Sequence, residues 1–84
     1  MLICLDGFTR QKALGSSASS EVVLAVRDAD QLALVLKAYA DDRRAGDRTR
    51  VEREFETLRA CAGPGVPQAF AVLRDQQPYV LALE

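Results

Sequence analysis

Short apolar runs divide the first half of the chain into three segments with the patterns of β-strands. Residues 7–14 (GFTRQKAL) carry Phe8 and Leu14 on one parity and mostly polar residues on the other, which predicts a strand with a polar outer face. Residues 21–26 (EVVLAV) and 32–39 (LALVLKAY) are rich in aliphatic side chains, and the polar RDADQ between them suits a tight turn. The pattern therefore predicts three consecutive antiparallel strands.

The charged middle of the chain has the periodicity of a helix. Its apolar positions recur at spacings of four, three and four, at Val51, Phe55, Leu58 and Ala62. Either Asp42 or Asp47 can cap the start of this helix, and the GPG sequence at residues 63–65 must end it because proline and glycine do not continue a helix. We expect the apolar stripe of the helix to face inward.

Two more strands are predicted after the helix. They lie at residues 68–73 (QAFAVL) and 79–84 (YVLALE), and the polar RDQQP between them suits a hairpin turn. The predicted fold class is α+β, with a five-stranded antiparallel sheet and one helix between strands three and four. A chain of 84 residues makes a single domain, residues 1–84, with a thin core.

Composition narrows the classes of partner. Of the residues, 49% are hydrophobic and 27% are charged, and the 11 Lys and Arg nearly balance the 12 Asp and Glu, which leaves a net charge of -1. Acids and bases are also interleaved, as in DDRRAGDRTRVERE. Such a chain has no overall field for polyanions, so nucleic acid is not an expected partner. No apolar run reaches the roughly 18 residues of a membrane span, and MLICLDGF lacks the basic leading region of a secretion signal. We therefore expect no membrane partner and a cytoplasmic location.

Histidine is absent from the chain, and the cysteines are Cys4 and Cys61. Without histidine, Ser-His-Asp and Cys-His catalysis are excluded, and two cysteines do not fill a four-ligand zinc site. For a cytoplasmic chain we expect two reduced structural thiols rather than a disulfide. The sequence predicts no metal ligand among these residues.

Lys37 is a cation inside an apolar strand. Strand parity places it with Ala33, Val35 and Tyr39 on one face and puts three leucines on the other, so that both faces look covered. We therefore expect the side chain of Lys37 to be at least partly buried.

Glu54 is the anion that the helix turns toward the same interior. It lies three residues after Val51 and four before Leu58, at the edge of the apolar stripe. An isolated buried ion costs several kcal/mol, so Lys37 and Glu54 are expected to pair. The alternative is that Lys37 reaches water and Glu54 pairs with Arg50 one turn back on the helix, which is worth only a few tenths of a kcal/mol.

The order and spacing of these residues resemble the N-terminal lobe of a serine/threonine protein kinase domain. The similarity rests on Leu14-Gly15, on Val22 seven residues after the glycine, on Lys37 at the end of LVLK, on Glu54 in REFETL and on the GPGV that follows. In that family a strand lysine in a V-A-I-K sequence binds the phosphates of ATP and pairs with a helix glutamate. The serine-rich loop and the PGV turn look most like the kinase modules of bacterial multidomain signalling proteins.

The resemblance implies a role for each matching residue. Lys37 would contact the α- and β-phosphates as a catalytic residue, and Glu54 would fix Lys37. Val22 and Val35 would enclose the adenine. The implied nucleotide-binding residues are Leu14, Gly15, the loop residues Ser16, Ser17, Ala18, Ser19 and Ser20, then Val22, Val35, Lys37, Leu83 at the gatekeeper position and Glu84 at the start of the hinge.

The loop departs from the G-x-G-x-x-G pattern of the family. Only Gly15 matches, and Ser17 and Ser20 occupy the second and third glycine positions. Serine keeps the backbone N–H that a phosphate would use, but its Cβ restricts positive φ and keeps a ligand farther from the chain. A nucleotide would then bind less tightly or differently, and a serine-rich hairpin turn without a ligand is the alternative.

The 84 residues contain neither the H-R-D-x-x-x-x-N catalytic loop nor the D-F-G metal-binding segment of the family. The resemblance therefore implies an ATP-binding lobe that is not catalytic alone, with Mg²⁺ held by residues absent from this chain and with a C-terminal lobe or downstream domains and a protein substrate as partners. Cleft residues left uncovered would favour self-association.

Two other functions are compatible with the same residues. One is a pseudokinase or regulatory interaction module with weakened nucleotide binding, which the missing glycines favour. The other is a free-standing α+β binding domain with no nucleotide role. A wide separation of Lys37 from Glu54, with the helix packed away from the sheet, would favour this second function.

Overall fold

The computed structural model describes residues 3–40, 50–61, 63–76 and 78–84. The elements in these residues are, in chain order, β1 (Phe8–Ser16), β2 (Ser20–Arg27), β3 (Leu32–Tyr39), α1 (Arg50–Ala60), β4 (Ala69–Leu73) and β5 (Val80–Leu83). An α+β fold with a five-stranded antiparallel sheet and one helix is therefore confirmed for the described part of the chain. Within that part, no helix is long and apolar enough to cross a membrane.

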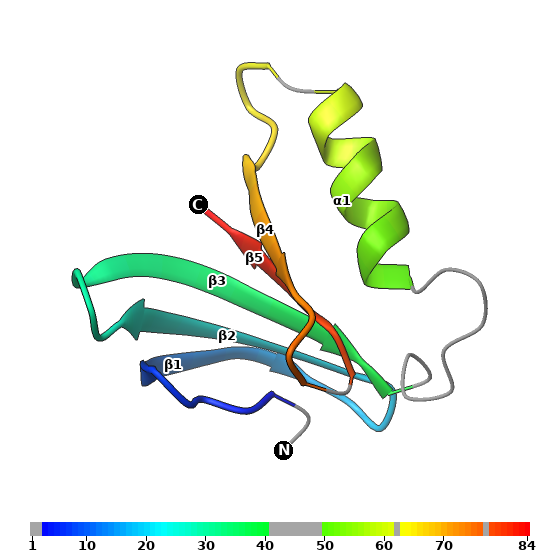
Figure 1. The fold of residues 1–84 in the computed structure, drawn as a ribbon. Coiled ribbons are helices and arrows are strands. Elements are labelled where there is room, and N and C mark those ends of the chain that lie inside the picture. Colours follow the sequence, from blue (N-terminus) through cyan, green and yellow to red (C-terminus); the bar gives the residue numbers. More distant parts are fainter. Residues whose placement is uncertain (1–2, 41–49, 62, 77) are drawn as a thin grey trace.

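The strands lie side by side in the order β1-β2-β3-β5-β4, and every neighbouring pair is antiparallel. The last strand in sequence, β5, therefore enters the sheet between β3 and β4, and α1 lies alongside β4 and β5 (Figure 1). The bounds of β3 agree with the sequence prediction, and the bounds of the other strands differ from it by at most two residues.

The first strand does not have the buried face that its alternation predicted. Phe8 is half-buried, but residues 9–16 are all exposed, and Leu14 exposes 48% of its surface. The reason is that β1 is an edge strand whose register against β2 shifts twice, with Gln11 and Leu14 as the extra residues. Each extra residue breaks the period of two on which the prediction depended.

The two faces of the sheet carry separate apolar clusters. The first cluster consists of the buried residues Ile3, Val23, Ala25, Leu34, Leu36, Ala38, Val80 and Ala82. The second lies on the face that α1 covers and consists of the buried residues Val51, Val72 and Leu81, with Tyr39, Phe55, Leu58, Tyr79 and Leu83 packed against them. The middle strands β3 and β5 supply alternate residues to the two clusters, as expected for strands covered on both faces.

The apolar stripe of α1 is confirmed where the structure describes it. Val51 is fully buried, and Phe55 and Leu58 are half-buried. The fourth stripe residue, Ala62, and the predicted caps Asp42 and Asp47 lie outside the described residues.

The sequence after α1 turns the chain back toward β4. Gly65 has a φ of 82°, a left-handed conformation that favours glycine. The backbone N–H of Val66 donates to the carbonyl of Gly63 at 3.2 Å and closes the turn. The GPG sequence therefore ends the helix within a few residues and returns the chain to the sheet.

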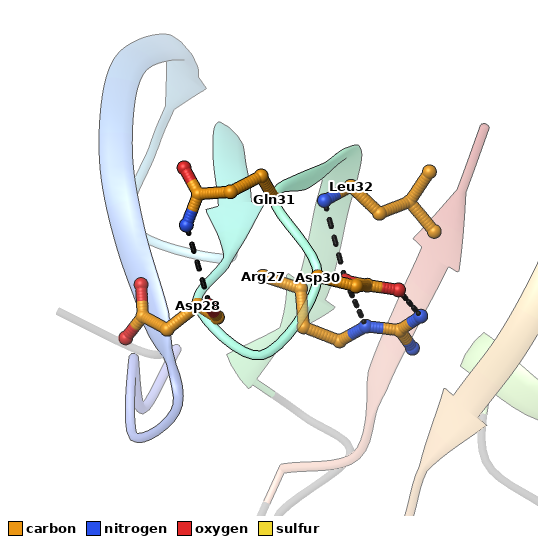
Figure 2. A network of polar contacts seen from close by, with 5 residues as sticks. All are labelled: Arg27, Asp28, Asp30, Gln31 and Leu32. Atoms are coloured by element: carbon orange, nitrogen blue, oxygen red, sulfur yellow. Dashed lines mark hydrogen bonds and ion pairs between the residues drawn. The ribbon is translucent and has the colours of Figure 1, made fainter.

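The turn between β2 and β3 is organised around one carboxylate. Asp30 accepts hydrogen bonds from Nε and Nη2 of Arg27, at 3.0 and 2.6 Å, and from the backbone N–H of Leu32 at 3.3 Å (Figure 2). Gln31 adopts a φ of 60°, and its side chain donates to the carbonyl of Asp28 at 3.3 Å. These contacts close the β2–β3 hairpin at the end of the strands opposite to Lys37.

The pKa of Asp30 depends on the hydrogen bonds of this turn. The hydrogen bonds from Arg27 are the largest cause that lowers the pKa of Asp30 to about 2 from 3.8. Because the folded pKa is the lower one, the stabilisation is complete above about pH 3.8 and is lost as the pH falls through about 2.

We therefore predict that carboxyl-resolved NMR titration places the midpoint of Asp30 near pH 2 and that Arg27→Gln moves it up toward 3.8. Arg10→Gln removes the same charge from the neighbouring strand and should leave the Asp30 midpoint in place. An equal response of Asp30 to both substitutions would contradict the role of the paired hydrogen bonds.

Candidate functional site

The site is centred on an ion pair between the sheet and the helix. Nζ of Lys37, near the end of β3, lies 3.1 Å from Oε1 of Glu54, in the first half of α1. Their side chains are 27% and 30% exposed, so both are partly buried. The helix packs against the face of the sheet that carries Leu81, and Lys37 is paired with Leu81 and so projects to the same face.

The ion pair predicted from strand parity and helix periodicity is therefore confirmed. Glu54 pairs across the interface instead of with Arg50, and the guanidinium of Arg50 lies 4.0 Å above the ring of Tyr39. The arrangement that would favour an unrelated domain, with the two charges far apart and the helix away from the sheet, is not the one observed. A half-buried pair of this kind holds its partners in place because breaking it leaves a poorly solvated charge.

Tyr39 completes the cluster. Its hydroxyl donates to Oε2 of Glu54 at 3.0 Å, so each oxygen of the carboxylate has one donor. Nζ of Lys37 also lies 5.2 Å from the centre of the Tyr39 ring, within the range of a cation–π contact. Sequence reasoning placed Tyr39 on the face of Lys37 but missed these contacts, because parity gives the face of a side chain and not its hydrogen-bond partner.

The surroundings keep Lys37 charged. Its pKa is raised from 10.5, and the Tyr39 hydroxyl is the largest cause, with the carboxylate of Glu54 acting in the same direction and partial burial in the opposite one. Because the folded pKa is the higher one, the stabilisation is complete below about pH 10.5 and is lost as the pH rises through the folded pKa. Lys37 is therefore a fixed ammonium at neutral pH.

Residues from four strands line up beside Lys37. Gly15 of β1 is paired with Val22 of β2, Val22 with Lys37, and Lys37 with Leu81 of β5. Directly paired residues in an antiparallel sheet project to the same face. The row brings together Gly15, Val22 and Lys37, which the sequence analysis placed in one site.

A second row of paired residues lies next to the first and is apolar. Val35 is paired with Leu24 on one side and with Leu83 on the other, and Leu83 is paired with Ala69 of β4. The four side chains are all half-buried. The structure therefore adds Leu24 and Ala69 to the predicted Val35 and Leu83, and the strip they form adjoins Lys37.

Backbone N–H groups of the serine-rich loop between β1 and β2 form hydrogen bonds within the loop. Oγ of Ser17 accepts from the backbone N–H of Ser19 at 3.2 Å and from that of Ser20 at 3.1 Å. The N–H of Ser17 donates to the carbonyl of Ser20 at 2.9 Å. The three serine N–H groups of the turn are thus engaged within the chain, and a ligand that used them would first have to displace these contacts.

The remaining predicted residues lie at the ends of the strands. Ser16 ends β1, Ala18 is in the exposed turn, and Leu14 is exposed on the edge strand. Glu84 follows β5, and its backbone N–H donates to the carbonyl of Gln68 at 3.0 Å. Within the described part of the chain, none of these four residues forms a hydrogen bond or an ion pair with Lys37 or Glu54.

Other candidate sites are less well formed. In the described part of the chain, no group of three or more His, Cys, Asp or Glu could hold a metal ion. Cys4 and Cys61 are free thiols, as expected for reduced cysteines, and both are exposed. A cavity of about 400 Å³ is lined by Leu58, Arg59, Gly63, Val66, Pro67, Gln68 and Ala69.

Comparison with protein-family models gives no match, and no curated protein has a sequence significantly similar to this chain. What can be said of function therefore depends on the residues and their geometry.

The geometry predicts how Lys37 responds to its partner. Glu54→Gln removes the negative charge beside Nζ, so the NMR titration midpoint of the Lys37 ammonium should fall. Glu52→Gln is the matched control because Glu52, on the same helix, pairs with Arg74. An equal fall in both variants would show that Lys37 senses the net charge of α1 rather than Glu54.

Proposed function

We propose that this chain is the ATP-binding N-terminal lobe of a serine/threonine protein kinase and that it is not catalytic alone. The observation that carries the proposal is the Lys37–Glu54 ion pair of 3.1 Å between the third strand and the helix. In the resembled family, the corresponding lysine binds the α- and β-phosphates of ATP and the helix glutamate holds it in position. The proposal is supported by the order of the elements as well as by the pair.

Lys37 has the chemistry that a phosphate requires. An ammonium has three N–H donors, and one of them is directed to Glu54. The others can donate to phosphate oxygens, and the raised pKa of Lys37 keeps the charge in place. In this role Lys37 binds the α- and β-phosphates and Glu54 is the residue that orients it.

The apolar strip supplies a surface for the adenine. Val22 and Val35 lie on the same face as Lys37, and Leu83 is paired with Val35. All three are half-buried, so a flat base lying on them would remove apolar surface from water. In the proposal Val22 and Val35 enclose the adenine, Leu83 is the gatekeeper and Glu84 begins the hinge.

The contacts of the β1–β2 loop favour weak nucleotide binding. A Cβ added at Gly15 would meet nothing within 4 Å, so no contact within the described residues requires glycine there, and its lack of a side chain leaves room for a ligand. Against this, the N–H groups of Ser19 and Ser20 are bonded to the Ser17 hydroxyl. This observation favours a second candidate function, a pseudokinase or regulatory module that keeps the ion pair and binds nucleotide weakly.

Chemistry would require groups that these 84 residues do not supply. In the family, an Asp of the catalytic loop acts as the base and the D-F-G Asp holds Mg²⁺. We propose that such residues of a C-terminal lobe complete the site and that a protein is the phosphoacceptor. The part of the present chain is to bind ATP and orient its phosphates.

The proposal predicts that ATP binds and that Lys37 provides the phosphate contact. In isothermal titration calorimetry, Lys37→Met should raise the Kd for ATP about 10-fold. This change corresponds to the loss of a charge-assisted hydrogen bond of about 1.4 kcal/mol. The binding of adenosine, which lacks phosphates, should change little. Lys12→Met, at the other lysine of the chain, is the matched control. If wild-type ATP binding is absent, or is reduced equally by both substitutions, the nucleotide assignment is wrong.

The loop generates a separate prediction. Ser17→Ala removes the hydroxyl that occupies the N–H groups of Ser19 and Ser20 and leaves those donors for a phosphate. We expect the Kd for ATP to fall by a factor of about 5, since one hydrogen bond is worth about 1 kcal/mol. Thr57→Ala, which removes a hydroxyl on the exposed side of α1, should leave the Kd unchanged. A weaker affinity in Ser17→Ala would show that the loop in its present form is the binding conformation.

A further inference from the structure

Tyr39 lies where the ion pair, the helix and the sheet meet. It is two residues after Lys37 on β3, and its ring packs against the cluster of Val51, Val72 and Leu81. Its hydroxyl donates to Oε2 of Glu54 at 3.0 Å. The ring is therefore anchored in the helix–sheet interface while its polar end reaches the carboxylate.

We propose that Tyr39 is a positioning residue that holds the carboxylate of Glu54 toward Lys37 and thereby sets the orientation of the ammonium for an anionic ligand. The inference that the ligand is the phosphate chain of ATP depends on the proposed function. The positioning itself depends only on the contacts among Tyr39, Glu54 and Lys37.

The hydroxyl restricts the choices of Glu54. A glutamate on a helix can rotate among several staggered conformations and can pair with a cation four residues earlier. Here Tyr39 fixes Oε2, so Oε1 is left for Lys37 at 3.1 Å. The hydrogen bond from Tyr39 therefore favours the conformation in which the carboxylate of Glu54 faces Lys37.

The ring acts on the competing cation. Arg50 is four residues before Glu54, which is the spacing of an ion pair on one helix. Its guanidinium instead lies 4.0 Å above the Tyr39 ring, in cation–π geometry. The aromatic ring thus contributes to holding the Arg50 guanidinium away from Glu54, while the hydroxyl binds one oxygen of Glu54 and Lys37 binds the other.

The composition of the chain makes a clean experiment possible. The sequence has only two tyrosines and two lysines, so each labelled residue type gives two NMR signals. Tyr79 packs against the same cluster as Tyr39, and its hydroxyl has no hydrogen-bond partner in the described part of the chain, so Tyr79→Phe is the matched control for Tyr39→Phe. The exposed Lys12 provides the reference signal for Lys37.

The first measurement is the titration midpoint of the Lys37 ammonium. We expect it to fall in Tyr39→Phe and to stay in place in Tyr79→Phe, while Lys12 is unchanged in both. The fall in the double variant Tyr39→Phe/Glu54→Gln should be smaller than the sum of the two single falls, because Tyr39 acts partly through Glu54. Additive falls, or an unchanged midpoint in Tyr39→Phe, would overturn the proposal, since a purely structural tyrosine would change only the melting temperature.

The second measurement separates this inference from the proposed function. With ATP as the probe, Tyr39→Phe should raise the Kd about 3-fold, in the lower range of what one lost hydrogen bond costs, and leave adenosine binding unchanged. If no variant binds ATP but the Lys37 midpoint still responds to Tyr39→Phe, the positioning role stands and the nucleotide function fails. If ATP binding depends on Lys37 but neither the Kd nor the midpoint responds to Tyr39→Phe, the positioning role fails and the nucleotide function stands.

A third measurement applies if Tyr39→Phe does not fold. In the wild-type chain labelled at the tyrosine Cζ carbons, lowering the pH neutralises carboxylates, and a neutral carboxyl is a weaker acceptor for the Tyr39 hydroxyl. The Tyr39 signal should then shift as the carboxylate titrates, and the Tyr79 signal should not. Parallel behaviour of the two signals would overturn the proposal.

Discussion

A partly buried charge has to be balanced, and in this protein that requirement fixes the helix on the sheet. Lys37 lies on a central strand where water reaches only part of its side chain, so it needs an anion nearby. Glu54 supplies the anion from α1, and Tyr39 holds the second oxygen of the same carboxylate. The polar contacts thus give the helix one orientation on a sheet against which an apolar stripe alone could slide.

The apolar contacts and the polar ones have different tasks in this small fold. The buried residues of β3 and β5 supply two clusters on opposite faces, and complete burial of each aliphatic side chain contributes about 2 kcal/mol. Such packing is non-directional, so it brings α1 to the sheet without deciding which side chains meet. The hydrogen bonds to Glu54 add the direction, because an acceptor left unsatisfied at this interface costs about 1–3 kcal/mol.

The two ends of the candidate site differ in how open they are to a ligand. Around Lys37 and Val35, a charge adjoins apolar surface, and the proposed binding of a phosphate attached to a flat base requires both. In the loop, by contrast, the Ser17 hydroxyl takes up backbone donors that glycines would leave open. The surface around Lys37 therefore supports the proposed nucleotide binding, and the hydrogen bonds of the loop support the second proposal, in which that binding is weak.

Much of the fold follows from local patterns in the sequence. The period of two in residues 32–39 and the spacing of Val51, Phe55 and Leu58 identify a covered strand and an amphipathic helix, because burial on a known side imposes a known period. The same patterns give the faces of Lys37 and Glu54, and a partly buried lysine then requires a partner. The strand–helix pair was accordingly predictable in kind.

Only the tertiary structure shows which strand lies at the edge of the sheet, how the strands are paired in register and which side-chain atoms make contact. On β1, two extra residues shift the register and leave Leu14 exposed, and alternation cannot reveal such a shift because the partner strand determines it. The hydrogen bond from Tyr39 to Glu54 and the stacking of Arg50 on the Tyr39 ring join residues of β3 and α1. The sequence by itself determined which residues had to be covered and which charges had to be balanced, since those depend on composition and local period. Only the packed structure decided which atoms meet, because that depends on the distance between elements that are remote in the chain.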